Sequence, residues 1–368
     1  METIITFILI LGLLILVHEL GHFISARRLG VDVEEFAIGF PPKIFSKKKN
    51  GVKYSINWIP LGGYVKIKGE SGDNTDDPNS FAVQPAWKKL IIVSAGVFMN
   101  FLLSFILLSI IFVSGFPQEL DGSIPADKIT DKRVTVLEIV KNSPADKAGI
   151  EIGDKVVSIN GEVFDDYNAA HDKIESLRGQ TVDIIVEKSN KQTEQYKIEH
   201  AQLDGEEASM IGIGIINTGV VNYGFFGGIW QGLKVTGIMI FRIIQALYYL
   251  IADLVTKGAV PEGFGGPVAV AMVTGEVIKL GFLRIVYFAA VLSINLGVIN
   301  FFPFPALDGG RALFISLQAI TRRKLNEKVE AWIHNSGFII LVALLVIITV
   351  RDFKNYGPMI FNSIKNLF

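Results

Sequence analysis

The chain has 368 residues, of which 50% are hydrophobic and 19% are charged, and its mean hydropathy is +0.43. Soluble domains average about 25% charged residues, so an ordinary soluble enzyme, a disordered chain and a collagen-like fibre all fit poorly. The formal net charge of −1 provides no basic field that would attract nucleic acid. Cysteine is absent, which excludes disulfides, thiolate metal sites and cysteine nucleophiles. We therefore expect membrane spans together with a soluble part.

Four segments are long and apolar enough to cross a bilayer as helices. They cover residues 4–26, 90–113, 282–304 and about 331–350. The alternative for the first segment is a cleaved signal peptide. This alternative is disfavoured because the start of the chain contains Glu2 but neither Lys nor Arg, and because no small-residue cleavage site follows.

Residues 229–254 are also apolar at helical spacing, but three charged residues interrupt them. These are Lys234, Arg242 and Asp253. An amphipathic helix that lies on the membrane surface, or packs against the other helices, fits this pattern best. A fifth span is the alternative.

The charge of the connecting segments predicts how the chain is oriented in the membrane. Residues 27–89 contain 11 Lys and Arg against 7 acidic residues, and residues 305–335 contain 5 Lys and Arg. Residues 114–281 contain 15 basic and 23 acidic residues. Short cytoplasmic loops are enriched in Lys and Arg. We therefore expect residues 27–89 and 305–335 in the cytoplasm, and residues 114–281 and both termini outside.

Residues 115–205, within the outer segment, are expected to form a soluble α/β domain. Strand-like β-branched runs at residues 134–140 and 181–187 flank the sequence Gly-Asp-Lys-Val-Val-Ser-Ile-Asn-Gly at residues 153–161. This stretch resembles the PDZ domains of bacterial proteases, and only one copy is visible. The resemblance implies a single PDZ domain that binds a peptide or protein ligand. Residues 206–281 then form a connector that contains the amphipathic helix.

Residues 31–70, on the cytoplasmic side, are expected to form a β-hairpin. Residues 33–40 and the alternating residues 52–58 flank an Asn50-Gly51 pair, which favours a tight hairpin turn.

The sequence His-Glu-Leu-Gly-His in the first predicted span indicates a metal site. On a helix, residues four apart share a face, so His18 and His22 can reach one ion. Glu19 is then placed to act as the general base on an attacking water. The alternative is a helix end whose polar side chains extend to the membrane interface. Ionisable groups inside a membrane are costly and by default functional, which favours the metal site.

A catalytic zinc ion needs a third protein ligand and an open position. His171 and His200 lie in the PDZ-like segment and His334 in the last cytoplasmic connection, so none of them is expected to face the first span. Asp308 follows two prolines at the interruption of the third span, where irregular backbone is tolerated only if it lines a cavity. The alternative is an Asp-Gly turn that merely ends the helix.

Together these motifs resemble the bacterial site-2 protease family and, more narrowly, the RseP-type (regulator of sigma E) intramembrane zinc metalloproteases. The resemblance rests on HELGH at residues 18–22, on N-x-x-P-x-P-x-LDGG at residues 300–310, and on the PDZ-like segment between them. It implies a membrane core of about four helices, built from residues 1–114 and 282–368, with the PDZ domain inserted. The best-known members carry two tandem PDZ domains, whereas this chain has room for one.

The resemblance also assigns the site and the reaction. The implied site residues are His18, His22 and Asp308 as ligands of one Zn²⁺, Glu19 as the catalytic residue, and Asn300 and Pro305 as substrate contacts. The implied reaction is hydrolysis of peptide bonds in or near transmembrane segments, in regulated proteolysis of an anti-sigma factor or of signal-peptide remnants. The implied location is the bacterial inner membrane, with the active site near the cytoplasmic side.

In the resembling family, the loop that corresponds to the hairpin re-enters the membrane and pairs with the substrate as an added strand. An edge strand can hold an unwound segment through main-chain hydrogen bonds. A plain hairpin packed on the helices is the alternative.

Two other function classes compete with a protease. A membrane-tethered PDZ scaffold with a structural zinc ion would need a fourth ligand, which neither Cys nor a suitably placed His supplies. A metal transporter would usually show more intramembrane acids and often internal repeats, and the sequence shows neither.

Overall fold

The computed structural model describes residues 2–120, 122, 124–188, 190–202, 209–258, 265–323 and 326–365. They form two compact units. The first, here called the helical unit, comprises Met1–Leu108, Leu233–Ile278 and Ile285–Phe368, and the second, the sheet unit, comprises Ser109–Gly232 and Lys279–Arg284. Residues 206–208 and 259–264 of the predicted connector lie outside the described residues.

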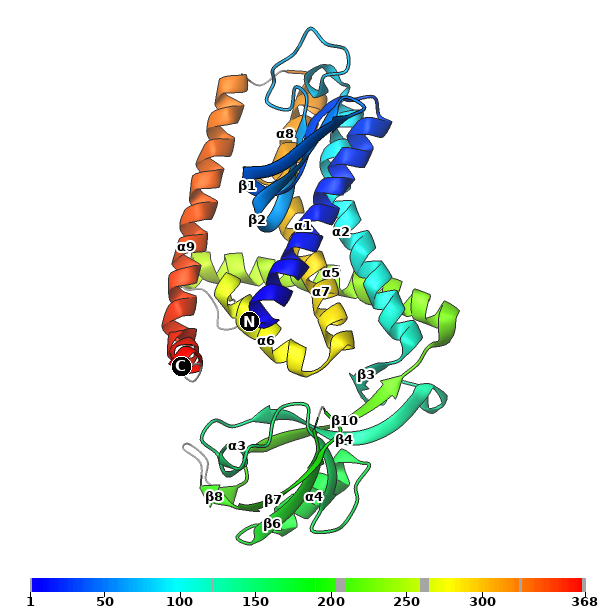
Figure 1. Cartoon of the computed structure of the whole chain (residues 1–368), viewed down its shortest axis with the longest axis vertical. Coiled ribbons are helices and arrows are strands. Elements are labelled where there is room, and N and C mark those ends of the chain that lie inside the picture. The colour runs from blue at the N-terminus through cyan, green and yellow to red at the C-terminus, as the bar shows by residue number, and fades with distance from the viewer. Residues whose placement is uncertain are drawn as a thin grey trace. The chain divides into compact units, whose positions relative to one another are not determined.

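The helical unit combines long helices with one β-hairpin (Figure 1). Helices α2, α5 and α7 extend across the boundary between the units. The elements are α1 (Glu2–Arg28), β1 (Val33–Lys49), β2 (Val52–Ile67), a 3-10 turn (Phe81–Val83), α2 (Ala86–Ser114), α5 (Gly224–Lys257), α6 (Pro267–Lys279), α7 (Phe282–Phe301), α8 (Asp308–Thr321) and α9 (Glu327–Lys365).

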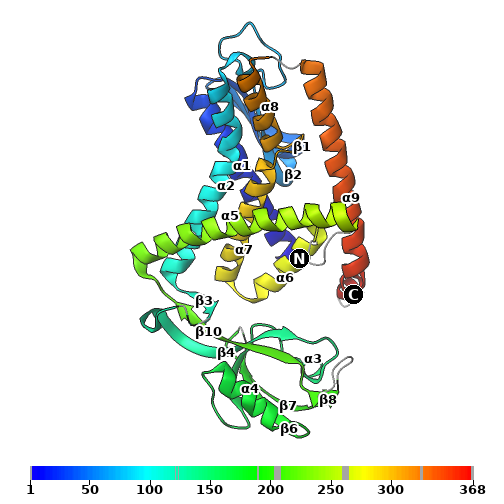
Figure 2. The same cartoon turned by 180° about the vertical axis from the view of Figure 1, so that it is seen from behind.

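Five helices in the described part of the chain are long and apolar enough to cross a membrane, namely α1, α2, α5, α7 and α9. The sequence predicted four, because the charged residues of α5 favoured a surface helix. Helix α5 nevertheless has the length and hydropathy of a span. Figures 1 and 2 both show its course in the helical unit running across the direction of α1 and α7.

The predicted β-hairpin is confirmed. The antiparallel strands β1 and β2 pair from Lys49 and Val52 at the turn. Asn50 and Gly51 both have positive φ, 51° and 82°, as a two-residue hairpin turn requires. Residues 35–38 form a central strand of the sheet, because they have Cα partners in residues 53–56 on one side and in residues 63–66 on the other. Residues 63–66 therefore form an outer edge of the sheet.

A shared apolar core fixes the hairpin to the helices. Buried residues of the hairpin contact buried residues of α1, α2 and α8. Helices α1 and α8 contain the metal ligands predicted from the sequence. The core includes Ala26, Val33, Phe36, Val52, Ile67, Ile92, Val93 and Ile315.

The sheet unit is built on a six-stranded antiparallel sheet with the order β3-β10-β4-β5-β6-β7. Its elements are β3 (Phe116–Glu119), a 3-10 turn (Ala126–Lys128), β4 (Ile129–Ile139), α3 (Pro144–Ala148), β5 (Lys155–Ile159), α4 (Tyr167–Ser176), β6 (Thr181–Glu187), β7 (Thr193–Glu199), β8 (Ala201–Gln202), β9 (Ser209–Met210) and β10 (Ile213–Val221).

Strand β10 lies beyond residue 205, where the sequence analysis ended the soluble domain. It pairs with β3 on one side and β4 on the other, so it is internal to the sheet. Its two glycines weaken the local strand signal. The strand is defined instead by partners 74 to 105 residues earlier in the chain, Arg133 and Glu119 among them. The sheet is therefore completed by an internal strand from a segment that the sequence assigned to the connector.

Candidate metal centre

Helix α1 presents both histidines of the predicted motif on one face. His18 and His22 are 5% and 8% exposed, because this face packs closely against α2. The close approach depends on Gly21, where a Cβ atom would overlap the main-chain carbonyl of Ala95. The motif therefore supplies two imidazoles and also the small residue that lets the helices approach.

Asp308 reaches the same place from a break between two helices. Helix α7 ends at Phe301 and α8 begins at Asp308, after a turn in which Ala306 has a φ of 77°. A Cβ atom on either of the next residues, Gly309 or Gly310, would overlap main-chain carbonyls of this turn. The first turn of α8 thus packs directly on the broken segment. The carboxylate also lies at a helix N-terminus, where the helix dipole favours negative charge.

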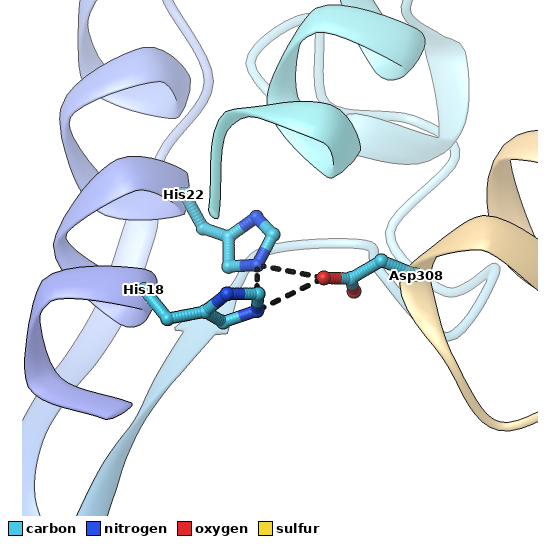
Figure 3. Close-up of side chains that lie close together, drawn as sticks. All are labelled: His18, His22 and Asp308. Atoms are coloured by element: carbon cyan, nitrogen blue, oxygen red, sulfur yellow. Dashed lines mark hydrogen bonds and ion pairs between the residues drawn. The ribbon is translucent and has the colours of Figure 1, made fainter. Parts of the chain in front are cut away.

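The three side chains converge on one point (Figure 3). His18 Nε2 lies 3.0 Å and His22 Nε2 lies 3.3 Å from Asp308 Oδ2, and the two Nε2 atoms are 3.2 Å apart. Zinc–nitrogen and zinc–oxygen bonds of about 2.0–2.2 Å in a tetrahedron separate neighbouring ligand atoms by about 3.3–3.5 Å. The triangle therefore matches one face of a tetrahedral zinc site, and the three residues fit the metal.

Gly96 of α2 leaves the space beside this triangle free. A Cβ atom at this position would lie 2.8 Å from His18 Nε2 and would overlap His22 Nε2. Gly96 could not be predicted from the sequence, because a glycine inside an apolar helix carries no local signal of what faces it. The structure identifies it as a helix position that has to lack a side chain for the imidazole nitrogens to stay accessible.

The ring nitrogen of His22 that faces away from the triangle, Nδ1, has a main-chain partner. His22 Nδ1 lies 2.8 Å from the main-chain oxygen of Ile92. A carbonyl can only accept, so Nδ1 carries the proton and the lone pair of Nε2 faces the triangle. The protein therefore fixes the tautomer that a metal ion needs.

Glu19 lies next to the triangle and has one oxygen in use. The main-chain N–H of Val65, in the edge strand of the hairpin, donates to Glu19 Oε2 at 2.9 Å. None of the described residues donates to the other oxygen, Oε1. The carboxylate is therefore oriented by the hairpin and keeps one acceptor for a further proton or water.

Two cavities of about 230 and 290 Å³ open beside the triangle, and His18, Glu19 and Asp308 line both. A water molecule takes up about 30 Å³, so each cavity holds several. The first also reaches Tyr64 and Val65 of the hairpin. The polar side chains of the triangle thus border spaces large enough for water.

The two predicted substrate contacts differ in position. Asn300 lines the second cavity, and its Nδ2 lies 3.5 Å from His18 Nε2. Pro305 lines neither cavity and packs instead against α9, where a Cβ atom on Gly337 would overlap it. The structure therefore brings Asn300 to the triangle but not Pro305.

His334 lies in α9, not in a connection as the sequence analysis expected, and it remains outside the triangle. Its Nδ1 accepts a hydrogen bond from the main-chain N–H of Ala306 at 3.0 Å. Since Ala306 has a positive φ, this bond supports the turn that leads to Asp308.

An ion pair at the first cavity was not foreseen from the sequence. Arg311, one turn after Asp308 on α8, pairs with Glu70, which follows β2, and both line this cavity. The partners are 241 residues apart, so no local pattern could indicate the pair. It links the helix that carries Asp308 to the hairpin that orients Glu19.

Comparisons with known proteins match almost the whole chain. The profile of peptidase family M50 matches residues 6–344. A Clostridium acetobutylicum protein assigned as a zinc metalloprotease is 34% identical, and the match covers 94% of this chain and 95% of that protein. The regulator of sigma-W protease RasP of Bacillus subtilis is 27% identical, with 96% and 98% covered.

Solved structures match part of the chain. The PDZ domain of the SdrC-like protein of Listeria monocytogenes is 29% identical to this chain, covering 24% of this chain and 92% of that domain, with a TM-score of 0.21.

The space beside Gly96 gives the first prediction. The Gly96→Ala substitution should lower zinc affinity about 5- to 150-fold, because the new methyl group overlaps the imidazole nitrogens and overpacking costs about 1–3 kcal/mol. Zinc bound per purified chain, measured by atomic emission in competition with a chelator, checks this. The matched control is Gly237→Ala on α5, where a Cβ atom meets nothing within 4 Å. Equal zinc affinity in the two variants would contradict the prediction.

The ion pair gives the second prediction. Glu70→Arg or Arg311→Glu alone should lower kcat/KM up to about fivefold, because like charges then face each other and a partly exposed pair contributes about 0.2–1 kcal/mol. The double reversal should recover most of the loss, as measured by cleavage of a membrane-anchored peptide in detergent. A double variant no better than the worse single one would show that the pair is not coupled.

Proposed function

Since this chain belongs to peptidase family M50 and is an intramembrane zinc endopeptidase, we propose that His18, His22 and Asp308 hold its zinc ion and that Glu19 is its catalytic base. The observation that carries the proposal is the triangle of ligand atoms, whose sides of 3.0 to 3.3 Å suit one tetrahedral ion. The described residues offer no further His, Asp or Glu to this group, so a coordination position stays open for catalysis.

The reaction divides between the ion and the chain. When bound, zinc polarises the scissile carbonyl and lowers the pKa of water toward about 7. Glu19 accepts the proton of the attacking water on its free Oε1 and delivers it to the leaving amine. The hydrogen bond from Val65 keeps the carboxylate turned toward the cavities while it does so. The two cavities supply the water.

The hairpin presents the substrate. A transmembrane helix has its peptide bonds paired internally, so it must be extended before it is cut. Residues 63–66 are the hairpin edge nearest Glu19, and an extended segment can pair with them as an added strand. Asn300 is the contact residue on the opposite side of the triangle, and Pro305 shapes the turn behind it.

We assign four membrane spans, with α5 lying on the extracytoplasmic surface of the membrane. The C-terminal half of α1 meets the segment just beyond the C-terminal end of α7, so these helices cross the membrane in the same direction. Helix α2 returns in the opposite direction, so the chain leaves α2 and enters α7 on the same side. Helix α6, with 13 residues, is too short to cross. A crossing by α5 alone would put the start of α7 on the wrong side.

The charges of the loops orient this arrangement. Residues 27–89 carry the excess of Lys and Arg, which favours the cytoplasm. The metal centre then lies near the cytoplasmic side of the bacterial inner membrane, and the sheet unit lies outside. If the chain crossed the membrane an odd number of times between them, the basic residues 27–89 and 305–335 would lie on opposite sides. The enrichment of Lys and Arg in cytoplasmic loops disfavours this arrangement.

The sheet unit is proposed to act as a PDZ-type domain that selects substrates through a peptide ligand. The Bacillus subtilis relative is a regulator of sigma-W protease. The substrate class that fits is therefore a membrane-anchored anti-sigma factor, with signal-peptide remnants as the second candidate.

The role of Glu19 gives the third prediction. Glu19→Gln should lower cleavage by about 10²- to 10⁴-fold while zinc content stays unchanged, because the base is lost and the ligands remain. Accumulation of an uncleaved membrane-anchored substrate fragment in cells, with zinc measured on the purified variant, checks both parts. The matched control is Glu2→Gln at the other end of α1. Normal cleavage by the Glu19 variant would refute the catalytic assignment.

The pairing of β10 with β3 gives the fourth prediction. Glu119 and Thr218 are Cα partners, so residues 121–216 can be replaced by a short linker between adjacent strands. Cleavage rates for different membrane-anchored fragments should then converge, while zinc content stays at the full-length level. The cleavage rates of a panel of membrane-anchored fragments that differ only in their extracytoplasmic segments measure this. A truncated enzyme that binds no zinc would show that the sheet unit is structural instead.

A further inference from the structure

Asn100 is a fully buried polar residue on α2, next to His18 of the metal centre. It is not among the zinc ligands or the reacting groups. We propose that Asn100 is a positioning residue whose side-chain oxygen accepts a hydrogen bond from His18 Nδ1–H and so holds His18 in the tautomer and orientation that binds zinc. This inference rests on the proposed zinc site.

The two ring nitrogens of His18 face different partners. Nε2 points into the triangle, 3.0 Å from Asp308 Oδ2 and 3.2 Å from His22 Nε2. Nδ1 points away from it and lies 3.2 Å from Nδ2 of the Asn100 side-chain amide. The amide therefore controls the nitrogen that does not bind the metal.

The chemistry of the ring decides which end of the amide must face it. A zinc ligand needs the lone pair on Nε2, which leaves the proton on Nδ1. Nδ1–H is then a donor, and only the carbonyl oxygen of Asn100 can accept from it. In the structure the amide nitrogen Nδ2 faces His18 Nδ1, which leaves Asn100 Oδ1 buried with no hydrogen-bond partner among the described residues; crystallographers resolve such cases by turning the amide over, which exchanges its oxygen and nitrogen. The orientation with oxygen toward Nδ1 pairs that oxygen and matches zinc binding.

The position of Asn100 is fixed from a third helix. Its main-chain oxygen accepts a hydrogen bond from Ser293 Oγ of α7 at 2.8 Å, and Ser293 is fully buried. Since α7 leads to the turn before Asp308, this contact ties α2 to the chain segment that supplies the third ligand. The amide is thus held between the elements that carry the ligands.

Helix α2 supports the site through one face. Ile92, Gly96 and Asn100 follow each other at four-residue spacing, so they share this face. Ile92 accepts from His22, Gly96 leaves room for the imidazole nitrogens, and Asn100 pairs with His18. Each histidine therefore has its own acceptor on the same helix, one from the main chain and one from a side chain.

A competing explanation is that Asn100 only packs α2 against its neighbours. The two explanations differ in what a change of chemistry at constant size does. An isosteric Asp still accepts from Nδ1–H, as in the carboxylate–histidine–zinc arrangements of metal sites. An isosteric Leu cannot accept at all.

The test uses the full chain in lipid nanodiscs and measures zinc affinity by competition with a chelator. Asn100→Leu should weaken zinc binding about 10- to 100-fold, as loss of a partner of a metal-binding histidine does. Asn100→Asp should bind zinc as tightly as the unmodified enzyme or more tightly. The matched control is Ser104→Ala, which removes a buried polar atom one turn further along α2. Its zinc affinity should not change.

Three results would decide against the proposal. These are zinc affinity unchanged in Asn100→Leu, a loss in Asn100→Asp equal to that in Asn100→Leu, and an equal loss in Ser104→Ala. Helix content and the melting temperature of the zinc-free variants separate misfolding from lost zinc affinity. If Asn100→Leu does not fold, the Asp variant decides, because tight binding supports the proposal and weak binding overturns it. Zinc retained by His18→Ala would instead refute the proposed zinc site.

Discussion

Two imidazoles and a carboxylate that meet inside an apolar helix bundle are the interaction on which the rest of this structure depends. Ionisable groups at membrane depth are costly unless they are paired, solvated or bound to an ion. The triangle of His18, His22 and Asp308 is paired internally and opens on two cavities. The surrounding elements supply what this arrangement requires, namely close approach of the helices, space for water and a main-chain acceptor for His22 Nδ1.

Glycines let the helices around the triangle approach each other closely, and the break between α7 and α8 lets Asp308 reach the histidines. Gly21 brings α1 against α2, and Gly309 and Gly310 bring α8 against the turn that precedes it. The break between α7 and α8 turns a carboxylate inward from a helix end, while the hairpin orients Glu19 from the other side. The proposed catalytic residues are thereby gathered beside two cavities, between helices long and apolar enough to cross a membrane.

Local patterns predicted the groups of this site but not the contacts that hold them. The i, i+4 spacing of His18 and His22 and the Asn-Gly turn of the hairpin are short-range signals, and the structure has both features. Asp308 could be predicted because a carboxylate after two prolines is unusual in an apolar segment. Gly96 and Asn100 could not, because their roles come from the neighbouring helix α1. Strand β10 was missed for the same reason, since distant partners define it.

Anomalous diffraction at the zinc edge, from crystals of the full chain in a lipid phase, tests the central claim most directly. We expect a single zinc peak at about 2.0–2.2 Å from His18 Nε2, His22 Nε2 and an Asp308 oxygen, with no fourth protein ligand. A peak elsewhere in the molecule, or a shell closed by a fourth side chain, would contradict it.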